Sequence, residues 1–355
     1  MREVARGLAA AAAALLAMAG VAAAGLALLG TGGAGLTAAV VALAVGGSVD
    51  VEAMPAGGLP VALHGDLHVI PLGVSLAGAV VLGWLLLRRR DGGLLVRGAA
   101  AAVAFPVGLT AITLPAQGKL ALPTGTGGPA GCLSGGSRLP LPGHLDAGFS
   151  VPAGPAVLGA IGWALVVVGA CWLITRFPVV ATVFRVARWP SAGLAVVCLA
   201  AAWAFGGAAA AGGVLLALPQ LVWGAVLLGL GVPWTVATTG ALTCVPDLGN
   251  FTPGFWASGA LLLGCGIAVA VRRSGGPLRR AAVVAAVAGG GSAVLTLLSR
   301  VSVDIAVSAF GFSVPVLDAR LTANPLLAFA AGAIAGFAGC LLADAISVSS
   351  RAWKR

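Results

Sequence analysis

Charged residues are scarce in this chain. Only 8% of its 355 residues are Asp, Glu, Lys or Arg, whereas 60% are hydrophobic. A soluble protein carries roughly a quarter charged residues, because its surface must face water. The composition therefore excludes a soluble globular protein, and it predicts that a lipid bilayer is the main surrounding and partner of the chain.

Histidine is also rare, and no group of residues indicates catalysis. His64, His68 and His144 all fall in segments predicted to lie outside the membrane. A carboxylate, Asp66, stands between the first two, and on a helix this i, i+4 spacing starts some metal sites. Gly65 breaks helix, however, so a solvated loop is favoured. We expect no enzyme, no catalytic residue, no cofactor and no metal site.

Eight apolar segments have about the 17–25 residues that a membrane-spanning helix needs. Each must be helical, since lipid offers no partner to free backbone N–H and C=O groups. The sequence thus predicts an all-α polytopic bundle. Its eight predicted spans are Leu8–Leu29, Val69–Leu87, Gly98–Ala116, Ala156–Thr175, Ala192–Gly213, Phe255–Val271, Ala281–Ser299 and Leu326–Ala343.

Two further apolar segments are too short to span. They are Gly35–Gly47 and Leu221–Val232, and Pro219 and Pro233 flank the second. Apolar segments of about 10–14 residues are typical of re-entrant or interfacial elements. We therefore predict two such elements beside the eight spans.

Arginine and lysine cluster between alternate spans, and cytoplasmic loops carry such an excess. With eight spans, all but four of the 20 Lys and Arg residues fall on one side; the four are Lys119, Arg138, Arg300 and Arg320. This pattern predicts a multi-pass plasma-membrane protein with cytoplasmic N- and C-termini. The net charge of +10 lies in juxtamembrane clusters and does not indicate nucleic-acid binding.

Two alternatives stay open near the termini and in the outer loops. The first apolar run, Leu8–Leu29, is longer than the core of a signal peptide and favours a span, with cleavage as the alternative. Cys132 and Cys244 fall in outer loops, where an oxidising exterior would allow a disulfide or leave two unpaired thiols.

The two halves of the chain resemble each other. Arg89–Arg97 matches Arg272–Arg280 at six of nine positions, and Gly148–Pro152 recurs as Gly311–Pro315. The short apolar segments also follow the first span of each half. These matches predict tandem parallel four-span halves, residues 1–190 and 191–355, related by a pseudo-twofold axis along the membrane normal.

Apolar motifs carry a family resemblance. Residues 40–47, Pro71–Ala79 and Leu221–Trp234 are similar to the streptophobe family of very hydrophobic actinobacterial membrane proteins. The resemblance covers most of the chain. It implies no activity and no functional residue, since that family has no settled biochemical role.

Two functions are compatible with these features. The spans hold almost no ionisable residue, which argues against a proton pump with a carboxylate relay. We expect a non-catalytic membrane or envelope component, which binds a membrane-protein partner or forms a homo-oligomer. The alternative is a channel or carrier near the two short segments, where Thr37 and Gln220 are the polar candidates.

Overall fold

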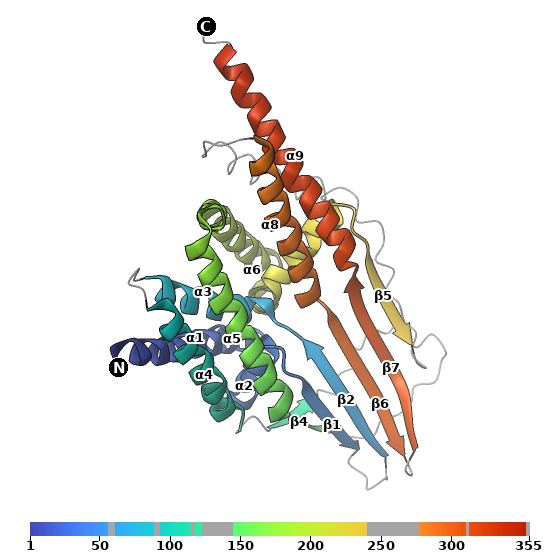
Figure 1. The fold of residues 1–355 in the computed structure, drawn as a ribbon. Coiled ribbons are helices and arrows are strands. Elements are labelled where there is room, and N and C mark those ends of the chain that lie inside the picture. Colours follow the sequence, from blue (N-terminus) through green and yellow to red (C-terminus); the bar gives the residue numbers. More distant parts are fainter. Residues whose placement is uncertain are drawn as a thin grey trace.

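The computed structural model describes residues 1–55, 61–88, 93–114, 118–122, 145–239, 277–309 and 312–352. Helices dominate it (Figure 1): α1 (Arg2–Leu28), α2 (Ala34–Ala44), α3 (Leu72–Leu87), α4 (Leu94–Thr113), α5 (Ala153–Arg176), α6 (Pro178–Gly229), α8 (Pro277–Leu298) and α9 (Pro325–Ala352). The strands are β1 (Val49–Pro55), β2 (Val61–Val69), β3 (Gly118–Leu122), β4 (Leu145–Ser150), β5 (Trp234–Thr239), β6 (Val301–Ala309) and β7 (Phe312–Ala323).

Within the described ranges, six helices are long and apolar enough to cross a membrane, as in a multi-pass membrane protein. They are α1, α4, α5, α6, α8 and α9, and each contains most of one predicted span. The predicted span Val69–Leu87 is shorter than expected, because Val69 belongs to β2 and α3 has only 16 residues. The predicted span Phe255–Val271 lies outside the described residues.

The helices α1, α3, α4 and α5 share one core. Met18, Leu82 and Phe105 are fully buried in it. The Phe105 ring stacks on Trp163 with centroids 4.6 Å apart, and the Trp163 indole N–H donates a 2.8 Å hydrogen bond to Ser75 Oγ. Close packing of this kind fits small residues on the helix faces.

The two short apolar segments, Gly35–Gly47 and Leu221–Val232, differ in the structure. The first is a short helix, α2, as the sequence predicts. The prediction that Leu221–Val232 stands alone is wrong, because helix α6 runs through Pro219 to Gly229. A proline inside a helix removes one hydrogen bond and bends the helix without always ending it. The real break is at Gly207, whose φ of 71° divides α6 into a first arm (178–206) and a second arm (208–229).

The second arm of α6 crosses the ends of two other helices. A Cβ added at Gly212 would lie 2.6 Å from the Gly25 carbonyl oxygen, close to the end of α1. One added at Gly73, at the start of α3, would lie 2.2 Å from the Leu215 carbonyl oxygen. The two backbones therefore touch where only glycine fits.

The prediction of an all-α chain is wrong, because connections that the sequence analysis placed outside the membrane form a seven-stranded antiparallel sheet. Its strand order is β3-β4-β1-β2-β6-β7-β5. In β6, apolar Val301, Val303 and Ile305 alternate with polar Ser302 and Asp304. This period of two is typical of a strand with one apolar face. The charged residues in these segments made them resemble loops.

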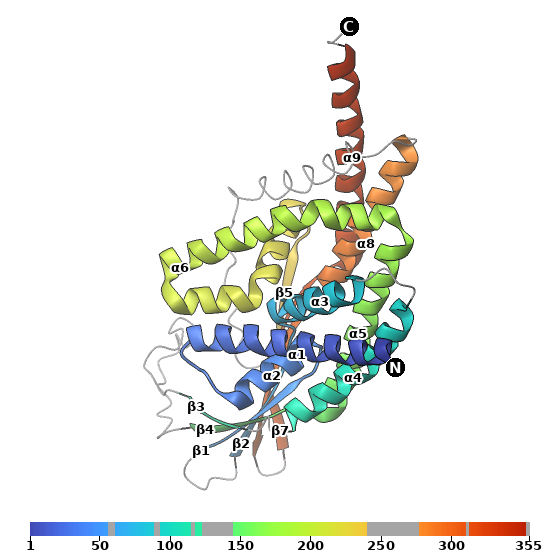
Figure 2. The same ribbon diagram turned by 90° about the vertical axis from the view of Figure 1, so that its left-hand side faces the viewer.

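All the strands lie at one end of the helices, which we call the sheet end (Figures 1 and 2). The chain enters β1 from α2, leaves β2 into α3, leaves β4 into α5, enters β6 from α8 and leaves β7 into α9. The opposite ends of α3, α4 and α5 carry Arg88, Arg97 and Arg176. We call this side the arginine end. The helices thus separate the arginine clusters from the sheet.

The strand order contradicts the predicted twofold axis. In the first strand set (β1–β4) the order is β3-β4-β1-β2, and in the second set (β5–β7) it is β6-β7-β5. A twofold axis along the strands would give the second set the reverse of the lateral strand order of the first set. In this sheet the second set instead follows the same lateral order as the first. The two sets are therefore displaced along one sheet.

The repeated motif Gly-Phe-Ser-Val-Pro also differs between the strand sets. Gly148–Ser150 end β4 next to α5, whereas Phe312–Pro315 lie at the end of β7 that is farther from α9. The two copies thus occupy unlike positions, and the motif does not mark equivalent places in the fold.

Candidate functional site

The sheet has one polar and one apolar face. At the start of β1, Val49 is buried with Phe149 of β4 against Ala39 and Leu43 of α2. The opposite face carries Glu52, His64, Asp66 and His68, which are exposed. Residues directly opposite each other on antiparallel strands share a face. The strand register therefore decides which polar groups meet.

The register brings four aspartates into one row across four strands. Asp50 of β1 lies opposite Asp66 of β2, Asp66 lies opposite Asp304 of β6, and Asp304 lies opposite Asp318 of β7. Cβ atoms of opposed residues are about 4.5–5.5 Å apart, and like charges at that spacing repel. We call this set the carboxylate row.

Two members of the row, Asp50 and Asp304, have pKa values above the ordinary value. Partial burial raises the pKa of Asp50 above its ordinary value, and hydrogen bonding to Asp66 and the charges of Asp66 and Glu52 raise it further. Partial burial also raises the pKa of Asp304, with the charge of Asp318 and hydrogen bonding to it as the next causes. The charge of Arg320 lowers the pKa of Asp304 in part.

The histidines do not form the helical pair that a metal site would need. His64 and His68 lie on β2, where positions i and i+4 are about 13 Å apart. His64 Nδ1 instead lies 3.5 Å from Glu52 Oε1 across the β1–β2 pair. In the described part of the chain, no three His, Cys, Asp or Glu residues are grouped as metal ligands.

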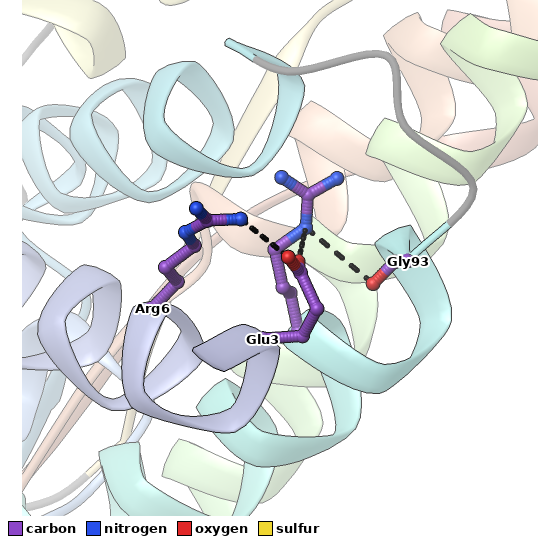
Figure 3. A network of polar contacts seen from close by, with 4 residues as sticks. Glu3, Arg6 and Gly93 are labelled. Atoms are coloured by element: carbon purple, nitrogen blue, oxygen red, sulfur yellow. Dashed lines mark hydrogen bonds and ion pairs between the residues drawn. The ribbon is translucent and has the colours of Figure 1, made fainter. Parts of the chain in front are cut away.

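A second polar cluster lies at the arginine end (Figure 3). Arg97, at the start of α4, has only 3% of its side chain exposed. Its Nε lies 3.2 Å from Glu3 Oε2 and donates a 3.4 Å hydrogen bond to the Gly93 carbonyl oxygen. Arg6 pairs with the other oxygen of Glu3. The network holds the start of α1 against the start of α4.

The two candidate pore residues are bonded to backbone within the fold. Thr37 Oγ1 donates a 2.9 Å hydrogen bond to the Gly33 carbonyl oxygen, one turn earlier in α2. The Gln220 side-chain amide donates to the Ile70 carbonyl oxygen, between β2 and α3. Gln220 therefore joins the second arm of α6 to the base of the sheet. The structure does not bring Thr37 and Gln220 into one polar path.

Cysteines contribute to packing where the structure describes them. Cys171 and Cys340 are buried in α5 and α9. Cys132 and Cys244, the pair considered for a disulfide, lie outside the described residues.

The sequence offered signals for the carboxylate row that the helical prediction did not use. Each aspartate stands in a segment of alternating polar and apolar residues, for example Val49–Val51 and Val303–Ile305. Such alternation indicates strands. The distant register that aligns Asp66 with Asp304 has no signal in the sequence alone.

No protein-family model, no curated protein and no solved structure matches this chain. The geometry of the chain itself therefore carries the functional argument.

Proposed function

We propose that this protein is a non-catalytic component of the plasma membrane that displays a β-sheet on the outer side. The helices are the anchor in this proposal, and the polar face of the sheet is the surface that meets other envelope molecules. Both termini and the arginine end lie in the cytoplasm. In this proposal the protein binds either another membrane protein or a second copy of its own chain.

One observation carries the proposal: all seven described strands join one sheet, and the helices α3, α4 and α5 carry Arg88, Arg97 and Arg176 at their opposite ends. Four separate connections of the chain contribute to it, namely α2–α3, α4–α5, α6–α8 and α8–α9. If the chain only filled the bilayer, short turns would be enough to connect the helices at these four places. Basic residues stay on the cytoplasmic side, so the sheet belongs outside.

The alternative, a channel or carrier at the short apolar elements, has less support. Val41, Ala42 and Ala44 of α2 are buried in the common core. Thr37 and Gln220 already bond to backbone oxygens. A permeation path needs polar groups that face a cavity. The described part of the chain offers none at these two residues.

Related halves are part of the proposal, and paired glycines support them. Among described glycines, Gly30, Gly46, Gly207 and Gly231 have positive φ, between 71° and 94°. Gly30 and Gly207 each end a long helix, and Gly46 and Gly231 each end the helix that leads into a strand.

The helix ends at Gly46 and Gly231 have the same hydrogen bonds. Gly46 N–H donates to Leu43 O and Gly47 N–H to Ala42 O, both at 2.9 Å. Gly231 N–H donates to Leu228 O and Val232 N–H to Leu227 O, also both at 2.9 Å. This is the pattern of a Schellman cap. The match favours α1 and α6 as equivalent starts of the two halves.

We also propose membership in the streptophobe family. The support is the apolar sequence of residues 40–47, Pro71–Ala79 and Leu221–Trp234. These residues belong to α2, to α3 with Pro71, and to the second arm of α6 with the start of β5.

Cysteine labelling in intact cells tests the orientation. The six native cysteines are first replaced by Ala or Ser. A membrane-impermeant maleimide should modify Glu52→Cys, whose position is exposed on β1, and should modify Arg88→Cys only after lysis. The opposite pattern would overturn the proposal. Thr31→Cys, at the exposed sheet-side end of α1, serves as the second outer position.

Flux measurements test the choice between the two functions. The purified chain in liposomes should carry no ion or small-solute flux above empty liposomes. Flux that changes with Thr37→Ala or Gln220→Ala would replace the present proposal with the channel. Thr175→Ala is the matched control. The Thr175 hydroxyl also donates a hydrogen bond to a backbone oxygen one turn earlier, that of Trp172, at an exposed site on α5.

A further inference from the structure

The two strand sets meet at one seam. Among the described strands, only β2 and β6 pair across the sets, over nine residue pairs from Val61 with Ala309 to Val69 with Val301. Asp66 and Asp304 lie opposite each other inside this seam. The seam is therefore the place where the first and second strand sets hold together or separate.

Each aspartate of the seam has a second aspartate beside it in its own strand set. The strand register places Asp50 directly opposite Asp66, and it places Asp304 directly opposite Asp318. Two carboxyl groups at such a distance resist double ionisation, and they share a proton when one is available. The row thus contains one such pair in each strand set, and the two pairs adjoin across the seam.

The groups around the row are few. On β1 and β2 the row faces Glu52, His64 and His68, and on β7 it faces Arg320, whose Nε lies 3.0 Å from Asp318 Oδ1. The row ends at two neutral residues, Ser150 of β4 and Thr239 of β5. Helix α2, which packs on the apolar face, has no titratable residue. Arg320 is therefore the permanent positive charge on the four strands that carry the row, and Lys119 of β3 is two strands away from Glu52, opposite Gly148.

We propose that the carboxylate row is a proton-dependent junction, which strengthens the β2–β6 seam in acid and weakens it at neutral pH. When Asp50, Asp66, Asp304 and Asp318 are all ionised, three successive opposed pairs repel each other. One Arg320 side chain, more than half exposed at 58%, offsets only part of this repulsion. Protonation of one carboxyl in each pair removes the repulsion and supplies a carboxyl–carboxylate hydrogen bond.

The direction of the pKa shifts gives the sign. The pKa values of Asp50 and Asp304 are raised above the ordinary 3.8 in the folded sheet. A raised pKa means that the folded sheet binds protons more tightly than the unpaired strands do. The stabilisation is complete below the ordinary value and is lost as the pH rises through the raised values.

Hydrogen exchange on the full chain in lipid nanodiscs tests the junction. Mass spectrometry would follow peptides from β2 and β6 between about pH 4 and about pH 8, with exchange corrected for the intrinsic effect of pH. Protection of β2 and β6 should fall as the pH rises, by about tenfold for each unit by which a pKa is raised in the folded sheet. Protection of β2 and β6 that is equal at both ends would refute the proposal.

Charge-removing variants assign the effect to the row. Asp66→Asn/Asp304→Asn keeps the side-chain shapes and should leave β2 and β6 protected at all pH values. The single variant Asp66→Asn should give an intermediate dependence, and it serves if the double variant does not fold. Peptides from α8 and α9 report folding and should be unchanged. A double variant that keeps the full pH dependence contradicts the proposal.

Two controls separate other causes. His64→Gln/His68→Gln should retain the pH dependence; its loss would assign the effect to the imidazoles and overturn the role of the carboxylates. Calcium chloride, compared with EDTA at neutral pH, should not restore protection; restoration would mean that the row holds a cation in place of protons. These measurements do not depend on which side of the membrane the sheet faces, so they are independent of the proposed function.

Discussion

Removal of the Glu3 carboxylate should destabilise the protein through Arg97, which lies one helix away. The Arg97 side chain is 3% exposed, and its Nε lies 3.2 Å from the carboxylate of Glu3, which is 34% exposed. In Glu3→Gln, the guanidinium of Arg97 keeps its burial, loses the carboxylate, and remains near Arg6. The start of α1 would then be held less firmly against α4.

The exposure of both partners sets the expected magnitude. Breaking a fully buried ion pair costs about 3–5 kcal/mol, because one charge stays buried without a partner. Water reaches Glu3, so we expect about 2 kcal/mol for Glu3→Gln, between the buried and surface values. A loss of this size lowers Tm by several degrees. The assay is thermal unfolding of the purified protein in a mild detergent.

Two variants make this experiment decisive. Glu52→Gln removes an acid that is 61% exposed beside His64, and it should change the free energy of unfolding by less than about 0.5 kcal/mol. Glu3→Gln/Arg97→Met removes both charges and should return to within about 1 kcal/mol of the native chain. If Glu3→Gln unfolds at the same temperature as Glu52→Gln, the buried ion pair does not hold α1 to α4.

Three further substitutions test the packing by the same unfolding assay. Gly73→Ala should destabilise by about 1–3 kcal/mol, because its methyl group meets the α6 backbone, whereas Gly20→Ala has open space and should be neutral or stabilising; equal effects would contradict the close approach. Gly231→Ala should cost about 1 kcal/mol, because φ is 75° there, and an unchanged Tm would argue against that backbone. Trp163→Phe should cost about 1 kcal/mol through loss of the hydrogen bond to Ser75, and the same substitution in a Ser75→Ala background should cost less.

The carboxylate row gives the sheet a property that the helices lack. Ion pairs and buried apolar groups hold the arginine end together, where the Glu3 carboxylate pairs with Arg6 and Arg97. At the sheet end, like charges oppose each other across four strands. Proteins place opposed like charges in a sheet at a cost in stability. Part of this cost falls at the seam, where Asp66 opposes Asp304, and the proposed pH sensitivity of the junction between the strand sets depends on it.

The sequence alone determined how the chain meets the bilayer. Runs such as Leu8–Leu29 and Ala156–Thr175 are long enough as helices to cross the hydrocarbon core, and in lipid the helix satisfies all their backbone groups. The short helix α2 was predictable from the length of its apolar run, which is too short to span the hydrocarbon core. These features depend on local composition, so no distant contact is needed to infer them.

Tertiary structure decided where the polar segments go. The break at Gly207 replaced the one expected beside Pro219, because packing against α1 and α3 holds the second arm of α6 across their ends. The strands form because segments as distant as Val61–Val69 and Val301–Ala309 pair with each other. Strand pairing satisfies backbone groups between separate segments, so neither segment specifies its partner alone. For that reason Asp66 and Asp304 appear in the sequence as two unrelated loop acids, and only the assembled sheet makes them neighbours.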